Sequence, residues 1–120
     1  ESTAVHDGSG WILNGEKTWN TGIHTATHDL VFARNAGKAG DAEGITAFLM
    51  PTDAPGFRVE EMLWTFNMPT DHGRVSFTNV RLPDSAVFGK VGRGLQVVQH
   101  FFNENRIRQA ASSLGAAQYC

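Results

Sequence analysis

The sequence has a single cysteine, Cys120, and only four prolines in 120 residues. One cysteine excludes an intramolecular disulfide framework and fits a reducing compartment. The chain also lacks a strong charge of either sign, since its formal net charge is −2, and this balance does not favour nucleic acid or an anionic membrane as a partner. No apolar run approaches the roughly 18–20 residues of a membrane span. These absences predict a soluble intracellular domain.

Glycine is abundant, with 13 residues spread mainly over the first three quarters of the chain. Turn clusters occur at residues 7–10 (DGSG) and 51–56 (PTDAPG), and residues 35–43 form a polar, glycine-rich loop. Asn14-Gly15 separates two strand-like runs and is typical of a type I′ hairpin turn, because both residues tolerate positive φ. The expected strands include residues 29–34, 44–50, 57–59 and 74–77. Many short strands between turns predict a mainly β fold, a small antiparallel barrel or sandwich.

The pattern changes after Pro83. Residues 94–120 contain no proline, and apolar residues recur there at helical spacing: Leu95, Val98, Phe102, Ala110, Leu114 and Ala117. A helix of this length is about 40 Å long, so a small β-domain cannot cover its whole apolar stripe. The chain begins with Glu1 in a strand-like run and ends without a helix stop signal. We therefore expect a piece of a longer chain, in which this helix belongs to a truncated helical bundle.

Three motifs allow a functional or a structural interpretation. Residues 89–94 (GKVGRG) could bind phosphate, but they match no known phosphate-loop spacing, and a flexible strand-to-helix joint is the simpler interpretation. His24 and His28 have metal-ligand spacing only on a helix; in the loop or strand that their neighbours favour, no metal site is predicted. Asp71-His72 could form an acid–base pair, or could belong to a polar loop (residues 64–73) that leads into the strand at Arg74.

Trp19 and Thr21 follow the first glycine turns. On a strand they face the same side, because side chains alternate. An indole beside a hydroxyl can seat a flat heteroaromatic ring, with the hydroxyl reaching a ring nitrogen or carbonyl. The spacing alone is more typical of a core tryptophan with a surface threonine.

The whole string of motifs resembles the acyl-CoA dehydrogenase family. Residues 7–22, which end in WILNGEKTWNTG, and residues 31–34 (VFAR) resemble the family's D-G-x-x-x-L-N-G-x-K-x-W-I-T-N-G followed by V-F-A-R. Residues 44–57 resemble G-I-T-A-F-I-V-x-x-D-T-P-G-F, and residues 77–83 (FTNVRLP) resemble F-x-x-V-R-V-P. Residues 89–117 resemble the start of the family's helical domain. The resemblance implies a middle β-domain over residues 1–88 and the start of a C-terminal helical domain over residues 89–120.

The resemblance also implies a cofactor and a reaction. Trp19, Asn20 and Thr21 match the segment that packs against and hydrogen-bonds to the FAD isoalloxazine ring in this family. The implied reaction is α,β-dehydrogenation of an acyl-CoA thioester to a trans-2-enoyl-CoA, with electron-transfer flavoprotein or a similar acceptor as partner and a homo-oligomeric enzyme. The implied compartment is the cytoplasm, or the mitochondrial or peroxisomal matrix in a eukaryote.

Two departures from the family pattern bear on activity. Residues 20–22 (NTG) replace the usual I-T-N, and residues 64–73 lack the common K-L-G-x-R-x-S, which indicates a divergent branch. The family's catalytic base lies late in the helical domain or immediately before the arginine that matches Arg106. Asn105 occupies that second position, and Glu104, one residue away, is rotated by about 100° on a helix. No catalytic residue is therefore predicted in the chain, with Glu104 only a weaker candidate.

Other functions remain open on the sequence alone. An acyl-CoA oxidase or a flavin monooxygenase could use the same fold with oxygen. A non-catalytic flavin- or CoA-binding module would need no base at all.

Overall fold

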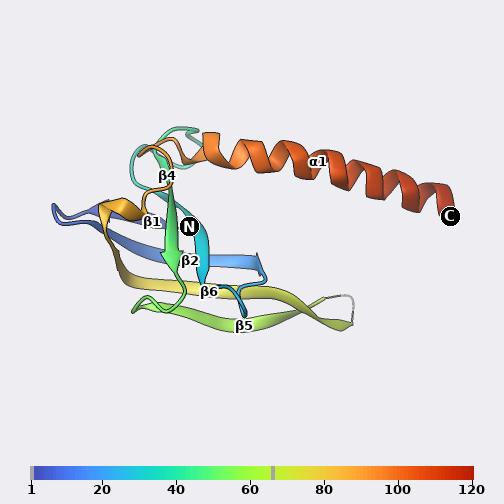
Figure 1. Ribbon diagram of the computed structural model, residues 1–120, viewed down its shortest axis with the longest axis horizontal. Helices are drawn as coiled ribbons and strands as arrows, with labels where there is room; N and C mark the ends of the chain where they lie inside the picture. The colour runs from blue at the N-terminus through green and yellow to red at the C-terminus, as the bar shows by residue number, and fades with distance from the viewer. Residues whose placement is uncertain (1, 66) are drawn as a thin grey trace.

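The computed structural model describes residues 2–65 and 67–120. Glu1 and Phe66, placed above in a strand and a loop, lie outside these residues. In chain order the elements are β1 (Thr3–His6), β2 (Trp11–Thr21), β3 (His28–Arg34), β4 (Ile45–Pro51), β5 (Phe57–Thr65), β6 (Met68–Leu82), the 3₁₀ turn η1 (Asp84–Ala86) and α1 (Gly94–Tyr119) (Figure 1). The expected mainly β fold with one long helix is confirmed.

The six strands form one sheet in the order β4-β3-β1-β2-β6-β5. All neighbouring strands are antiparallel except β1 and β3, which pair in parallel. β4 and β5 are the edges, so the sheet stays open instead of closing into a barrel. In Figure 1, β2, β6 and β5 run along the molecule while β4 crosses them steeply, which gives the sheet two arms.

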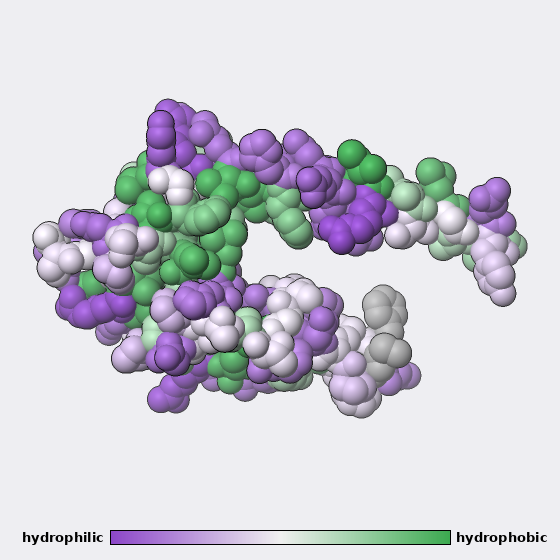
Figure 2. All heavy atoms as spheres, viewed as in Figure 1, coloured by the Kyte–Doolittle hydropathy of each residue, from purple (hydrophilic) through white to green (hydrophobic). Residues whose placement is uncertain are grey.

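The hydrophobic core lies where these two arms meet. Its largest fully buried apolar side chains are Phe48, Leu13, Met50, Val31, Val75 and Val80. Trp11 on β2 packs edge-to-face against Phe48 on β4, with ring centroids 5.3 Å apart. This contact joins one arm to the other, and apolar residues gather in the same region of the surface view (Figure 2).

The hairpin predicted at Asn14-Gly15 is wrong. β2 continues through both residues, and a register shift against β6 between Leu13 and Gly15 marks a β-bulge there. The Asn14 side chain accepts a hydrogen bond from the Asn79 N–H at 2.8 Å and donates one to the Asn79 side chain at 3.2 Å. Asn79 itself has a φ of +50°. The asparagine therefore anchors a bulge between two strands instead of closing a turn.

The loop predicted over residues 64–73 is also wrong. β5 and β6 continue along it as a hairpin, in which Trp64 pairs with Pro69 and Met62 pairs with Gly73. Asp71 and His72 consequently lie on a strand. Pro69 is accepted on β6 because it lies beyond His72, the last β6 residue paired with β2, so only β5 flanks it there.

The joint before α1 is held firmly to β4, which contradicts the flexible joint expected for residues 89–94. Thr46, fully buried on β4, donates to the Asn35 side chain at 2.7 Å and accepts from the Gly92 N–H at 2.8 Å. A Cβ at Gly94 would lie 2.7 Å from the Ala47 nitrogen, so only glycine permits this approach. α1 therefore starts from a fixed point on the sheet.

Beyond its first two turns, α1 projects away from the sheet (Figure 1). The predicted helix is confirmed, and much of its apolar surface is exposed: Phe101, Phe102, Ile107, Leu114 and Tyr119. The molecule measures 57 × 28 × 24 Å as a result. Among the described residues, no helix has the length and apolar character needed to cross a membrane.

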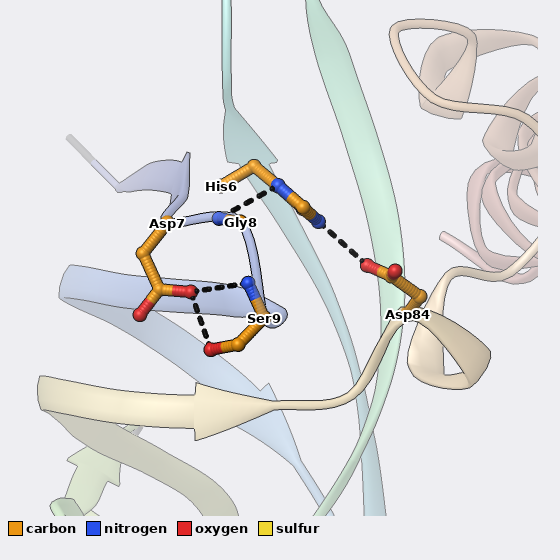
Figure 3. A network of polar contacts seen from close by, with 5 residues as sticks. All are labelled: His6, Asp7, Gly8, Ser9 and Asp84. Carbon is orange, nitrogen blue, oxygen red and sulfur yellow. Dashed lines mark hydrogen bonds and ion pairs between the residues drawn. The ribbon is translucent and has the colours of Figure 1, made fainter.

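A second polar network ties the β1–β2 turn to η1 (Figure 3). The His6 Nδ1 accepts a hydrogen bond from the Gly8 N–H at 3.2 Å, so its Nε2 carries the ring hydrogen and donates to Asp84 at 2.9 Å. Asp7 accepts from the Ser9 N–H and hydroxyl and pairs with Arg81. The turn predicted at residues 7–10 is thus confirmed. It is held by the His6–Asp84 contact on one side and by the Asp7–Arg81 ion pair on the other.

Candidate functional site

Trp19 lies at a break in the regular strand. The pairing of β2 with β6 shifts between Lys17 and Asn20, and Trp19 has a φ of +68°. The other described non-glycine residues with positive φ are asparagines, Asn67 and Asn79, which adopt this conformation more readily. An aromatic residue in this region is an outlier of the kind found at functional sites. Trp19 is 58% exposed, so a ligand can reach its side chain.

His72 on β6 joins Trp19 to Thr21. The Thr21 Oγ1 lies 2.9 Å from the His72 Nδ1, and the Trp19 and His72 rings meet edge-to-face at a centroid distance of 6.3 Å. The Asp71 carboxylate is 3.5 Å from the same nitrogen. Trp19 and Thr21 therefore lie close together on one side of the sheet, although the bulge, not simple alternation, brings them there.

Asn20 points elsewhere. Its side-chain amide donates to the Asp29 carboxylate on β3 at 2.8 Å. Partial burial raises the pKa of Asp29, and the Asn20 hydrogen bond opposes this rise. Burial likewise lowers the pKa of Lys17, while the Asp29 charge opposes that change. The Asn20 side chain thus ties β2 to β3 and is not part of the Trp19–Thr21–His72 cluster.

The arrangement suits a flat, polar ring system. Trp19 offers an exposed aromatic surface, Thr21 offers a hydroxyl beside it, and His72 fixes both. His72 was missed as a partner because it is 51 residues from Thr21 in sequence. Its only signal was the Asp71-His72 pair, which was interpreted without knowledge of the strand opposite.

The other sequence candidates are not part of this cluster. Glu104 is exposed on α1, and His24 lies in the turn after β2. Within residues 2–65 and 67–120, no group of three or more His, Cys, Asp or Glu side chains could hold a metal.

The glycine-rich joint borders an open groove of about 620 Å³ between residues 35–44 and 91–93. The Gly92 N–H is already used by Thr46, and Arg93 pairs with Glu43. Asp41 and Glu43 also give the groove negative charge. These contacts favour a structural joint over a phosphate site.

Comparison with known proteins defines the class of this domain. Residues 1–80 match the family model of the acyl-CoA dehydrogenase middle domain. The chain is 34% identical over 122 residues to the glutaryl-CoA dehydrogenase of Desulfococcus multivorans, covering 99% of this chain and 31% of that protein. The chain belongs to the acyl-CoA dehydrogenase family, and it spans under a third of this relative's length.

Solved structures agree with this result. A Mycobacterium abscessus protein assigned to the acyl-CoA dehydrogenases superposes with a TM-score of 0.81 at 33% identity, covering 92% of this chain and 28% of that one. The FAD complex of PigA superposes with a TM-score of 0.74 at 27% identity, covering 83% of this chain and 26% of that one. The open sheet and the helix that follows it are thus features of the family's fold.

Proposed function

We propose that the protein containing this chain is an FAD-dependent acyl-CoA dehydrogenase that converts an acyl-CoA thioester to a trans-2-enoyl-CoA. The observation that carries the proposal is the exposed Trp19 ring beside the Thr21 hydroxyl, on a strained bulge, in the segment that resembles the family's flavin contact. Under this proposal residues 1–88 are the middle domain and residues 89–120 begin the helical domain.

The residues present fit a flavin. The Trp19 indole supplies an apolar surface for one side of the isoalloxazine ring and keeps water from it. The Thr21 hydroxyl supplies a hydrogen bond to a ring nitrogen or carbonyl, and Asn20 holds the strand through Asp29. When bound, FAD accepts hydride from the acyl β-carbon while a carboxylate base removes the α-proton.

The full-length enzyme provides the first test. Acyl-CoA added without oxygen is expected to bleach the flavin absorbance, and an artificial acceptor is expected to restore it. Trp19→Ala should weaken FAD binding about fivefold, because a stacking contact contributes on the order of 1 kcal/mol. Trp64→Ala removes another exposed tryptophan from β5, which β6 separates from β2, and serves as the control. Equal FAD affinity in all three proteins would remove Trp19 from the site.

The reaction class is tested separately. A dehydrogenase passes its electrons to a protein acceptor such as electron-transfer flavoprotein, whereas an oxidase or monooxygenase consumes oxygen with each acyl-CoA. Stoichiometric oxygen uptake would replace the proposal with the oxygen-using alternative. The 120-residue chain alone is expected to show no turnover, because Glu104 is its only candidate base and projects into solvent on α1.

A further inference from the structure

We propose that His72 is a positioning residue: its Nδ1–H donates to the Thr21 hydroxyl and thereby directs the hydroxyl hydrogen outward to the ligand. This inference rests on the proposed function, since it assigns a proton to the same flavin contact. The geometry that carries it is the 2.9 Å distance between the His72 Nδ1 and the Thr21 Oγ1.

A threonine hydroxyl has one hydrogen to donate and two lone pairs. If the imidazole accepted that hydrogen, Thr21 could offer the ligand only a lone pair. Flavin ring nitrogens and carbonyls that act as acceptors need the hydrogen itself. The direction of the His72–Thr21 bond therefore decides which ligand atoms Thr21 can contact.

The surroundings of His72 favour a hydrogen on Nδ1. The Asp71 carboxylate oxygen lies 3.5 Å from that nitrogen, and its negative charge favours a hydrogen there over a lone pair. With the hydrogen on Nδ1, the Thr21 oxygen, 2.9 Å away, is the acceptor. In the part of the chain that the structure describes, Asp71 is the one ion-pair partner of His72; its other partners are uncharged, Trp19 and Thr21 on β2 and Thr70 on β6.

The ring is also held in place. Trp19 packs against it with an interplanar angle of 78°. The His72 backbone N–H donates to the Thr70 hydroxyl at 3.4 Å, which holds the backbone that carries the ring. Since Trp19 is proposed to touch the flavin, one imidazole aligns both contacts. A ligand that fits this pair therefore combines a flat face with an acceptor at its edge.

A double-mutant cycle in the full-length holoenzyme tests the inference, with FAD dissociation and the visible flavin spectrum as readouts. His72→Phe keeps a ring against Trp19 and removes the donor, so about fivefold weaker FAD binding and a spectral shift are expected. In the Thr21→Val background the same change should have no further effect, because the two residues act as one unit. His72→Asn, whose amide places an N–H near the position of Nδ1, should restore binding to within about twofold.

His28 offers a matched control, because its Nδ1 lies 3.1 Å from the Thr27 hydroxyl in the same kind of pair at the start of β3. His28→Phe should leave both readouts unchanged. Thermal unfolding of each variant separates loss of fold from loss of the contact. If Thr21→Val alters FAD binding but His72→Phe does not, or if their effects add, the role of His72 is overturned alone. If Thr21→Val has no effect, the flavin contact itself fails and both proposals fail with it.

Discussion

Trp19 combines an unfavourable backbone with an exposed ring. The φ of Trp19 is +68°, in the left-handed region, which costs a non-glycine residue roughly 1–2 kcal/mol. The exposed indole recovers little of this by burial, since 58% of it remains accessible. The cost is understandable if the bulge exists to bring the indole beside Thr21 and His72.

The strain at Trp19 can be measured by comparing two truncations. Trp19→Gly should unfold at higher urea than Trp19→Ala, with a difference of about 1 kcal/mol, because glycine accepts positive φ freely. At Trp64, whose φ is not positive, the order should reverse, since glycine normally costs about 0.5–1 kcal/mol relative to alanine. The same order at both positions would show that Trp19 carries no backbone strain.

Asp7 should make the fold sensitive to acid. Hydrogen bonds from the Ser9 N–H and hydroxyl, then from Arg81, hold the pKa of Asp7 well below its usual range. Because the pKa is lower in the folded state, the stabilisation is present above the unfolded pKa of about 4 and is lost as pH falls toward the folded value. Urea unfolding at pH 7, 4 and 2.5 should show Asp7→Asn less stable than wild type at pH 7 and the gap narrowing with acid. A constant gap would contradict this.

The sequence predicted the chemical role of single residues, but not which residues they contact. Trp19 and Thr21 were recognised from spacing and resemblance, but His72 was not, because no local pattern shows which strand lies opposite β2. Asn14-Gly15 was misassigned for the same reason: its turn chemistry is genuine, yet Asn79, 65 residues away, uses it to anchor a bulge.

At the scale of elements, sequence periodicity predicted the C-terminal end of α1 to within one residue. A long segment without proline and with apolar residues at helical spacing has few alternatives to a helix. The strands were located, but their lengths were not. β5 and β6 extend as a hairpin over residues that contain proline and glycine, and the pairing between them overrides these local signals. The open sheet likewise depends on long-range pairing.

The attachment of α1 to β4 should depend on Gly94. Gly94→Ala places a Cβ 2.7 Å from the Ala47 nitrogen, so it should destabilise the fold or displace the helix. Gly115→Ala, in the same helix with nothing within 4 Å, should instead stabilise by about 0.5–1 kcal/mol. Thermal unfolding and amide exchange of residues 94–97 measure both. Equal stabilisation by the two alanines would show that the close approach is not maintained.

At the scale of the whole molecule, the exposed apolar side chains of α1 are the main feature. Phe101, Ile107 and Leu114 are 57%, 73% and 72% exposed. Leaving such side chains in water forgoes roughly 1.5–3 kcal/mol each, so burying them against a partner is favourable.

The 120-residue chain is therefore expected to associate with a second copy through α1. Sedimentation should show dimers or larger species that dissociate in Phe102→Asp. Gln109→Asp, on the same helix, adds the same charge without removing an apolar side chain and serves as the control. A monodisperse monomer at tens of micromolar with its helix intact would contradict the expectation.

Within the residues that the structure describes, α1 is attached to the sheet at its N-terminal end only, so a small rotation there moves the other end much further. The attachment consists of the Thr46–Gly92 hydrogen bond and the close approach of Gly94 to β4. The 26 residues of α1 form a helix about 39 Å long. A tilt of α1 by about 5° at this attachment moves its C-terminal end by about 3 Å, which is comparable to a hydrogen-bond distance. Substitutions around Thr46 are therefore expected to displace residues at the C-terminal end of α1, such as Tyr119, without contacting them. The flavin contact at Trp19 should stay unchanged.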